Sequence, residues 1–293
     1  MLVHLNGQLL HRDQARISVF DRGFLFGDGI YEGLRAFRGK VVGMPGHIAR
    51  MNNGLREARI AWDAVQLAPL TRQLLDANKL ADAFIYWHIT RGTPNPADPV
   101  RSRKPASDLP PTVFGFCTPT PPLEQYLPPN PPPTKTAVVM EDTRWLRGHI
   151  KAISLIGSVL NTLESSEAGA DDAVLVRSGL LAETTSANIV IATPRSDGTT
   201  AIATPSLASV SILAGVTRDL LLREAARQGV AIEDRPVQAS ELETASEVIA
   251  VGTLTMITAI TRLIGRELCG GQPGPVATRL LSLLVDAIRR EQA

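Results

Sequence analysis

The sequence is poor in cysteine, the residue that forms disulfides and many zinc sites. Its 293 residues include two cysteines, Cys117 and Cys269, far apart and without the paired spacing of a zinc site. Cysteines so placed predict neither a disulfide framework nor a metal site, and they favour a reducing compartment. We therefore expect a cytoplasmic protein that holds no metal.

Long hydrophobic runs and an excess of one charge are also missing. No apolar run approaches the roughly 20 residues needed to cross a bilayer, and the first residues lack the charged-then-apolar pattern of a signal peptide. The 30 Lys and Arg residues balance 29 Asp and Glu residues, for a net charge of +1. We therefore expect neither a nucleic acid nor a membrane among its partners.

Proline, in contrast, is concentrated in one stretch. Residues 119–133 contain eight of the 21 prolines, and proline at this density extends the backbone and blocks regular pairing. We expect a stiff linker there, between a small domain of residues 1–118 and a larger domain of residues 134–293. Strand and helix patterns mix without strict alternation on both sides of it, which favours the α+β class.

Four local patterns predict individual segments of the chain. Asn6-Gly7 between two short apolar runs indicates a β-hairpin. Residues 17–20 and 83–90 read as strands, the second with alternating faces. Residues 92–111 have no periodicity, and a loop of that length in a compact domain is usually functional or mobile.

One lysine, Lys151, precedes a helical pattern. Apolar residues recur behind it at spacings of three and four, which predicts a helix with one apolar face: Ile153, Ile156, Leu160 and Leu163. We expect this face to pack on a core and so to fix the lysine at the start of the helix. A lysine that forms a Schiff base needs such a fixed position, whereas a solvated lysine does not.

Other segments carry groups that could act with this lysine. Glu183 lies in a turn rich in small polar residues, and Gly215-Val216-Thr217 opens a helix whose free N–H groups could hold a phosphate. Gly252-Thr253-Leu254-Thr255 is a second turn with hydroxyls, and Arg50 is a cation that could pair with the same phosphate. An aldehyde-reactive amine, a phosphate site and a carboxylate for a pyridine nitrogen are what pyridoxal phosphate requires. Each feature also has an ordinary explanation, as a solvated side chain or a plain helix start.

Several motifs in a fixed order resemble the fold-type IV pyridoxal-phosphate-dependent aminotransferases, the family of D-amino-acid aminotransferase, branched-chain aminotransferase and aminodeoxychorismate lyase. The resemblance extends from about Asn6 to the C-terminus. Its motifs are Asp21-Arg22-Gly23, Phe26-Gly27-Asp28-Gly29-Ile30-Tyr31-Glu32, His47-Ile48-Ala49-Arg50, Glu141-Asp142-Thr143-Arg144-Trp145, Ile150-Lys151, Glu183 through Asn188, Gly215-Val216-Thr217-Arg218-Asp219 and Gly252-Thr253.

The resemblance implies a fold and a set of roles. It implies a two-domain α+β enzyme with a small α/β N-terminal domain, a larger β-barrel-like C-terminal domain and, usually, a homodimer. Lys151 would be the Schiff-base lysine and proton shuttle, and Glu183 would keep the pyridine nitrogen protonated. The phosphate would be held by Arg50, Val216, Thr217 and Thr253; Leu213 would pack on the ring, and Tyr31 would stand near the substrate.

The implied reaction is a ping-pong transamination between an amino acid and a 2-oxo acid. The segment 141–160 resembles the D-amino-acid enzymes, but Pro96 and Asp98 occupy the places of their Arg-x-His carboxylate trap. The segment 31–36 resembles the L-branched-chain enzymes, in which a turn like that at Thr253 and Leu254 holds the carboxylate.

We expect the D-amino-acid type, with that turn helped by a basic residue: Arg35, Arg101 or Arg103. An L-branched-chain aminotransferase is the alternative, followed by an aminodeoxychorismate lyase and by a scaffold without activity. Pyruvate release without a keto-acid acceptor would identify the lyase, and a yellow protein that bleaches with a D- or L-amino acid would exclude the inactive scaffold.

Overall fold

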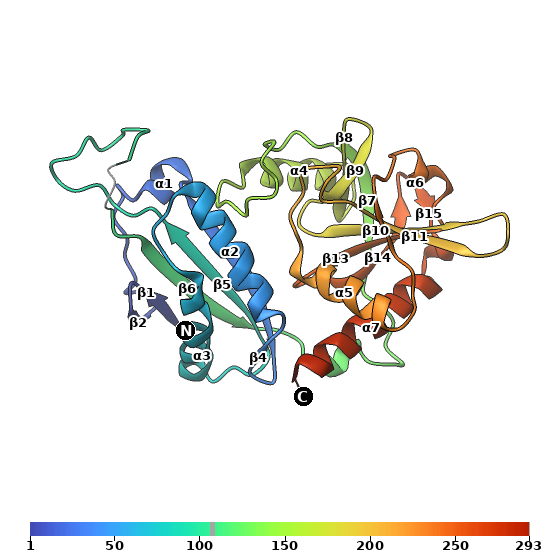
Figure 1. The fold of residues 1–293 in the computed structure, drawn as a ribbon, viewed down its shortest axis with the longest axis horizontal. Helices are drawn as coiled ribbons and strands as arrows, with labels where there is room; N and C mark the ends of the chain where they lie inside the picture. The colour runs from blue at the N-terminus through green and yellow to red at the C-terminus, as the bar shows by residue number, and fades with distance from the viewer. Residues whose placement is uncertain (106–108, 293) are drawn as a thin grey trace. The chain divides into compact units, whose positions relative to one another are not determined.

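The computed structural model describes residues 1–105 and 109–292, so residues 106–108 of the expected loop 92–111 and residue 293 lie outside it. The chain divides into two compact units (Figure 1). The first unit contains Met1–Pro122 together with Ile150–Leu155, and the second contains Leu123–His149 and the chain from Ile156 onward. The domain boundaries expected from the proline-rich stretch stay a prediction.

The first unit is built on an antiparallel sheet. Its described strands are β1 (Leu2–Leu5), β2 (Gln8–His11), β3 (Gly29–Phe37), β4 (Lys40–Val41), β5 (Ala83–Thr90) and β6 (Thr112–Pro119), in the order β2-β1-β6-β5-β3-β4. The hairpin at Asn6-Gly7 and the strand at 83–90 are confirmed.

The strand expected at residues 17–20 is wrong. Ser18 instead forms a local turn, in which its hydroxyl accepts a hydrogen bond from the Phe20 N–H and its carbonyl accepts one from the Asp21 N–H. Asp21 then caps the next helix by accepting a hydrogen bond from the Gly23 N–H. Side-chain and turn hydrogen bonds of this kind compete with a strand ladder, which the apolar pattern does not reveal.

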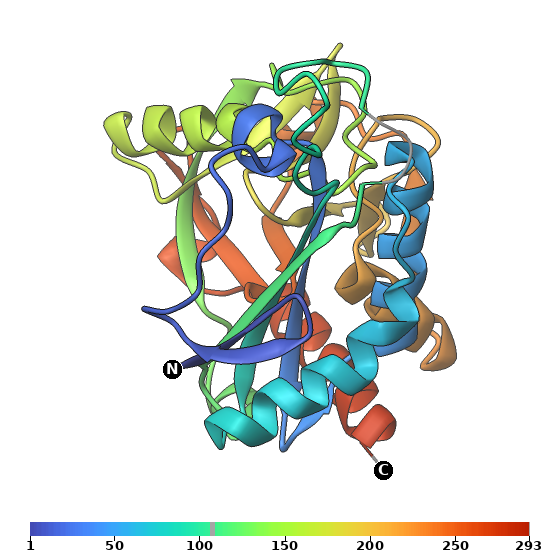
Figure 2. The ribbon, with the colours of Figure 1, turned by 90° about the vertical axis from the view of Figure 1, so that its left-hand side faces the viewer.

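Helices cover one face of this sheet (Figures 1 and 2). They are α2 (Met44–Ala58) and α3 (Leu67–Asn78), joined by a 3₁₀ turn at Ala64–Gln66, while the short α1 (Arg22–Phe26) precedes β3. Trp87 is fully buried beneath them, and its indole N–H donates to the Thr71 hydroxyl at 2.9 Å. Alternate residues of β5 therefore enter the core, as the period of two predicts.

The second unit is built on a mixed sheet. Its described strands are β7 (Thr134–Glu141), β8 (Asp172–Arg177), β9 (Leu180–Thr184), β10 (Asn188–Pro194), β11 (Thr200–Pro205), β12 (Glu233–Arg235), β13 (Glu247–Gly252), β14 (Met256–Leu263) and β15 (Arg266–Glu267). They run in the order β12-β11-β10-β13-β14-β7-β8-β9, with β15 on β14. The N–H of Leu181 in β9 donates to the carbonyl of Val237, just after β12. The two ends of the sheet thus approach each other, and the sheet curls into a partial barrel.

Both faces of this sheet are buried along β8. Val174 and Val176 enter one apolar cluster, whereas Ala173 and Leu175 enter another. The described helices are a 3₁₀ turn at Leu123–Tyr126, α4 (Ile156–Glu167), α5 (Val216–Arg227), α6 (Glu241–Thr244), a 3₁₀ turn at Cys269–Gly271 and α7 (Pro275–Gln292). Together the two units confirm the α+β class.

The helix expected to begin at Lys151 begins later, and its apolar face is not in a core. Helix α4 starts at Ile156 and buries only Asn161 and Ser165 among its side chains. Ile156 is 70% exposed and Leu163 is 54% exposed. The spacing correctly predicts one apolar face, but periodicity does not say which surface covers that face. Lys151 is therefore held in place by other contacts.

The close contact between Gly115 and Trp87 generates a prediction about the first unit. A methyl group on Gly115 would lie 2.5 Å from two ring carbons of Trp87. We expect Gly115→Ala to lower the free energy of unfolding by about 1–3 kcal/mol, because the ring is enclosed and cannot move away. Urea unfolding would measure it, with Thr118→Ala in the same strand as control at under about 0.5 kcal/mol. Equal effects of the two substitutions would contradict this account of the packing.

Candidate active site

The backbone around Lys151 pairs with the start of β3. The Tyr31 N–H donates to the Lys151 carbonyl at 3.0 Å, and the Ile153 N–H donates to the Gly29 carbonyl at 3.1 Å. Lys151 Nζ lies 4.2 Å from the centre of the Tyr31 ring. An isolated antiparallel bridge to β3, and not a helix, therefore positions this lysine beside Tyr31, which the family resemblance implies would stand near the substrate.

Two glycines allow this segment to approach. A side chain on Gly29 would lie 2.7 Å from the Ile89 carbonyl and 2.8 Å from Ile153. Gly27 has a φ of +64° and would meet Ser154, whose hydroxyl donates to the Gly27 carbonyl. The Gly-x-Gly of this motif thus provides room for the chain that carries Lys151.

Behind this face of β3, Glu32 binds two side chains of α2. Its carboxylate accepts from Arg50 Nε and Nη2, both at 2.7 Å, and lies 2.8 Å from His47 Nδ1. The Glu32 side chain is fully buried, and the Arg50 side chain is 10% exposed. His47 and Arg50 are three residues apart, so both lie on the helix face that meets the strand.

The charge of this group follows from its contacts. Burial alone would raise the pKa of Glu32, but the charge and hydrogen bonds of Arg50, aided by His47, lower it to about 2. Burial lowers the pKa of His47, although Glu32 opposes that shift. Glu32 is thus ionised at neutral pH and fixes the Arg50 guanidinium.

The other basic candidates of the first unit differ in their exposure. Arg35 is buried, and its guanidinium donates to the Pro121 carbonyl at 2.9 Å and stacks on Phe37. Arg101 and Arg103 are exposed in the 92–111 loop. The buried Arg22 holds that loop by donating to the carbonyls of Ser102 and Arg103. The side chains of Arg101 and Arg103 are therefore the more accessible ones.

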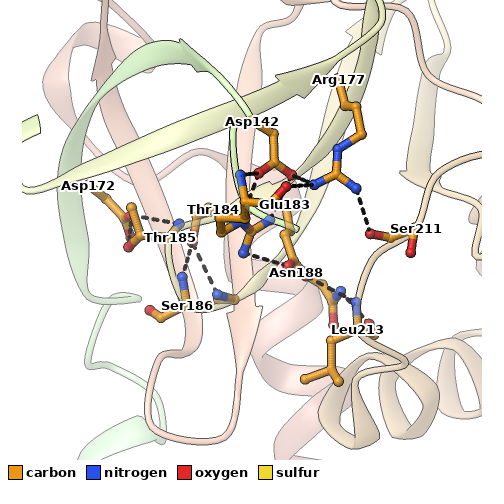
Figure 3. A network of polar contacts seen from close by, with 12 residues as sticks. Asp142, Asp172, Arg177, Glu183, Thr184, Thr185, Ser186, Asn188, Ser211 and Leu213 are labelled. Carbon is orange, nitrogen blue, oxygen red and sulfur yellow. Dashed lines mark hydrogen bonds and ion pairs between the residues drawn. The ribbon is translucent and has the colours of Figure 1, made fainter. Parts of the chain in front are cut away.

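In the second unit, the loop before α5 is held by side chains of the 183–188 segment. Glu183 Oε2 accepts from the Leu213 N–H at 3.4 Å, and the Asn188 amide donates to the Leu213 carbonyl at 3.0 Å (Figure 3). A side chain on Gly215 would lie 1.9 Å from the Asn188 oxygen. Gly215 is therefore required where the loop enters α5, whose first residues are Val216 and Thr217.

A third loop lies beside these two. The turn between β13 and β14 contains Thr253 and the half-exposed Leu254. A side chain on Gly252, at its start, would contact Ala187 at 3.2 Å. Three loops of the second unit thus bring together a carboxylate, a helix N-terminus and a threonine-bearing turn, which could hold an aromatic ring with an attached phosphate.

One part of this site is absent from the expectations based on sequence. Glu183 Oε1 pairs with Arg144 Nη1 at 2.9 Å, and Arg144 pairs with Asp142, which also pairs with Arg177. Asp142 and Arg144 lie in the quoted Glu-Asp-Thr-Arg-Trp motif, but no pattern indicates that they contact Glu183. The nearest signal is the acidic pair Glu141-Asp142 directly after the apolar run 137–140.

The structure places the candidates in two groups. The first unit holds Tyr31, Arg35, Arg50 and Lys151, and the second unit holds Glu183, Leu213, Val216, Thr217, Thr253 and Leu254. Within residues 1–105 and 109–292, no cluster of three His, Cys, Asp or Glu side chains could hold a metal ion. No helix in that part of the chain is long and apolar enough to span a bilayer.

Comparisons with known proteins agree on one family. The sequence profile described as Amino-transferase class IV matches residues 29–263. A D-alanine aminotransferase of Bacillus licheniformis is 30% identical, over 100% of this chain and 99% of that protein. A putative branched-chain-amino-acid aminotransferase of Methanocaldococcus jannaschii is also 30% identical, over 96% and 94%. The structure resembles a branched-chain aminotransferase of Thermoproteus uzoniensis, solved with norvaline, with a TM-score of 0.81, 23% identity, and coverage of 99% and 97%.

The buried Glu32–Arg50 pair generates a prediction about stability. Glu32→Gln leaves the Arg50 charge uncompensated, so we expect a loss of about 3–5 kcal/mol at pH 7. Because the folded pKa of Glu32 is about 2, below its ordinary value of 4.5, wild type has this stabilisation above pH 4.5 and loses it as pH falls toward 2. The difference in unfolding free energy should therefore narrow between pH 4.5 and 2. Urea titrations would measure it, with the exposed Glu57→Gln as control; a difference independent of pH would refute the assignment.

Proposed function

The chain belongs to the class IV aminotransferases, and from this membership we propose that it moves the amino group of a D-amino acid to a 2-oxo acid with pyridoxal phosphate. The observation that carries the D-amino-acid type is the 30% identity to a D-alanine aminotransferase along the whole of both chains. The L-branched-chain type is the second candidate, supported by a relative of equal identity and by the missing Arg-x-His trap.

The loops of the second unit suit the cofactor. The N–H groups of Val216 and Thr217 in the first turn of α5, together with the hydroxyls of Thr217 and Thr253, would hold the phosphate. Glu183 would face the pyridine nitrogen, and Leu213, whose backbone Glu183 and Asn188 anchor, would pack on the ring. The bound cofactor supplies an electron-withdrawing ring that stabilises negative charge at the substrate Cα atom.

Residues of the first unit would supply the amine and a fixed cation. Lys151 would bind the cofactor through Nζ and then carry the proton of the substrate Cα atom. Its backbone pairing with β3 limits the positions that Nζ can reach, which favours proton transfer along one path. Arg50, which Glu32 holds through two hydrogen bonds, would pair with the phosphate as a point of fixed charge.

The substrate carboxylate needs a partner other than an Arg-x-His pair. We propose the turn at Thr253 and Leu254, helped by a basic residue of the first unit. Arg35 is buried against Pro121, so the exposed Arg101 and Arg103 are the better candidates of the three. Tyr31, which lies beside Lys151, would contact the substrate.

Two copies of the chain are expected to pair through α4. Ile156, Val159, Leu160 and Leu163 occupy one face of that helix and are each at least 48% exposed. A row of large apolar side chains left in water is costly, and a second copy of the chain would cover it. The homodimer implied by the sequence resemblance is consistent with this face.

An enzyme assay tests the proposed reaction. The protein, loaded with pyridoxal phosphate, should form pyruvate from D-alanine in the presence of 2-oxoglutarate, with a higher kcat/KM than for L-leucine. Lys151→Ala should lower kcat by about 10³-fold or more, because it removes the amine that moves the proton. Faster turnover of L-leucine would favour the branched-chain type. Pyruvate release from aminodeoxychorismate without an acceptor would identify a lyase.

A matched pair of substitutions tests the dimer. Leu160→Glu places a charge in the centre of the exposed α4 face, so sedimentation velocity should show mainly monomer where wild type is dimeric. Glu164→Gln on the same helix should leave the dimer intact. A Leu160→Glu protein that still sediments as a dimer would exclude this face as the interface.

A further inference from the structure

Four buried charged side chains form a chain of alternating sign that ends at Glu183. Glu183 Oε1 binds Arg144 Nη1 at 2.9 Å, and Arg144 Nε and Nη2 bind the two oxygens of Asp142 at 2.8 and 2.9 Å. Arg177 Nη2 binds Asp142 Oδ2 at 2.8 Å. No side chain of the four is more than 15% exposed, and Figure 3 shows the Asp142 carboxylate beside the Arg177 guanidinium.

Neighbouring strands bring these residues together. Asp142 follows β7, and its N–H donates to the Val176 carbonyl in β8. Arg177 ends β8, which pairs with β7 in parallel, and Glu183 lies in β9 on the other side of β8. Arg177 also donates to the Ser211 carbonyl at 3.3 Å, so it ties Asp142 to the loop that leads to Leu213.

The way that Arg144 divides its contacts decides how much charge Glu183 retains. Arg144 gives two hydrogen bonds to Asp142 and pairs with Glu183 through Nη1. Its positive charge is therefore offset mainly by Asp142, so that Glu183 keeps most of its negative field. In a buried site, where screening by water is weak, a charge two links away still changes the potential at Glu183.

The ionisation of the middle pair agrees with this geometry. Burial would raise the pKa of Asp142, but the hydrogen bonds and charge of Arg144 and the charge of Arg177 bring it below its ordinary value. Burial would lower the pKa of Arg144, but Asp142 and Glu183 outweigh burial and raise that pKa above its ordinary value. Both members of the pair are thus charged at neutral pH.

We propose that Asp142 and Arg177 are positioning residues that act through Arg144 to set the negative charge that Glu183 presents to the ring nitrogen of the cofactor. This inference rests on the proposed function, because it requires pyridoxal phosphate to bind with its ring against Glu183. Asp142 offsets much of the positive charge of Arg144, so that Arg144 does not neutralise Glu183. Arg177 in turn offsets part of the negative charge of Asp142. The four side chains together carry no net charge, and the balance among them sets how tightly the ring nitrogen holds its proton.

Substitutions at the two positions have opposite expected effects. Asp142→Asn removes a negative charge and leaves Arg144 to offset Glu183, so the ring nitrogen should hold its proton about tenfold less tightly. Arg177→Gln removes a positive charge, so the nitrogen should hold its proton more tightly. A role confined to folding would not produce shifts of opposite sign.

The experiment is a pH titration of the protein reconstituted with ¹⁵N-labelled pyridoxal phosphate, in which the ¹⁵N chemical shift reports protonation of the ring nitrogen. Asp172→Asn is the matched control. Asp172 is also buried, but it accepts hydrogen bonds from the Thr185 N–H and hydroxyl (Figure 3) and pairs with Lys135. We expect the control to leave the ring titration unchanged, although it costs stability.

Each result of this titration has a defined meaning. Shifts of opposite sign in the pKa of the ring nitrogen in the Asp142 and Arg177 variants, with no shift in the control, support the proposal. Should Asp142→Asn not fold, a rise in that pKa in Arg177→Gln would support the proposal and an unchanged pKa would overturn it. Ring titrations equal to wild type, in proteins that bind the cofactor and transaminate, would overturn the inference and leave the proposed function intact. Failure of wild type to bind pyridoxal phosphate would overturn both.

Discussion

Buried charge must be paired, and in this chain the pairing builds the candidate site. Glu32 holds Arg50 and His47 inside the first unit, while Asp142 holds Arg144 and Arg177 inside the second. A lone ion at any of these positions would cost several kcal/mol, so each side chain is confined to the place where its partner lies. Rigid arginines are useful where a phosphate or a ring substituent must be met in one geometry.

The sequence was sufficient for features that depend on local patterns. The hairpin at Asn6-Gly7, the alternating strand at 83–90 and the α+β class follow from turn chemistry and period. The order of motifs is specific enough to indicate the aminotransferase family. In the second unit, the motif residues lie at strand ends and at a helix start. These positions form three loops that contact one another.

Features that depend on distant partners could not be predicted. The partners Glu32 and Arg50 are 18 residues apart, and Asp142 and Arg177 are 35 apart, so no periodicity connects them. The apolar spacing after Lys151 correctly predicts the apolar face of α4 but not its surroundings. The same spacing occurs whether the core of the same chain or another molecule covers such a face. The prediction of a strand at 17–20 was wrong because Ser18 forms local hydrogen bonds, which a hydrophobicity pattern does not reveal.

The division of the chain has a consequence for the order of assembly. Residues 150–155 belong to the first unit, although the chain on both sides of them belongs to the second. During synthesis β3 is therefore complete long before the segment that pairs with it emerges. Lys151 takes its place only when the chain returns to a sheet whose strands all precede it in the sequence. The first unit thus serves as the template on which Lys151 is placed.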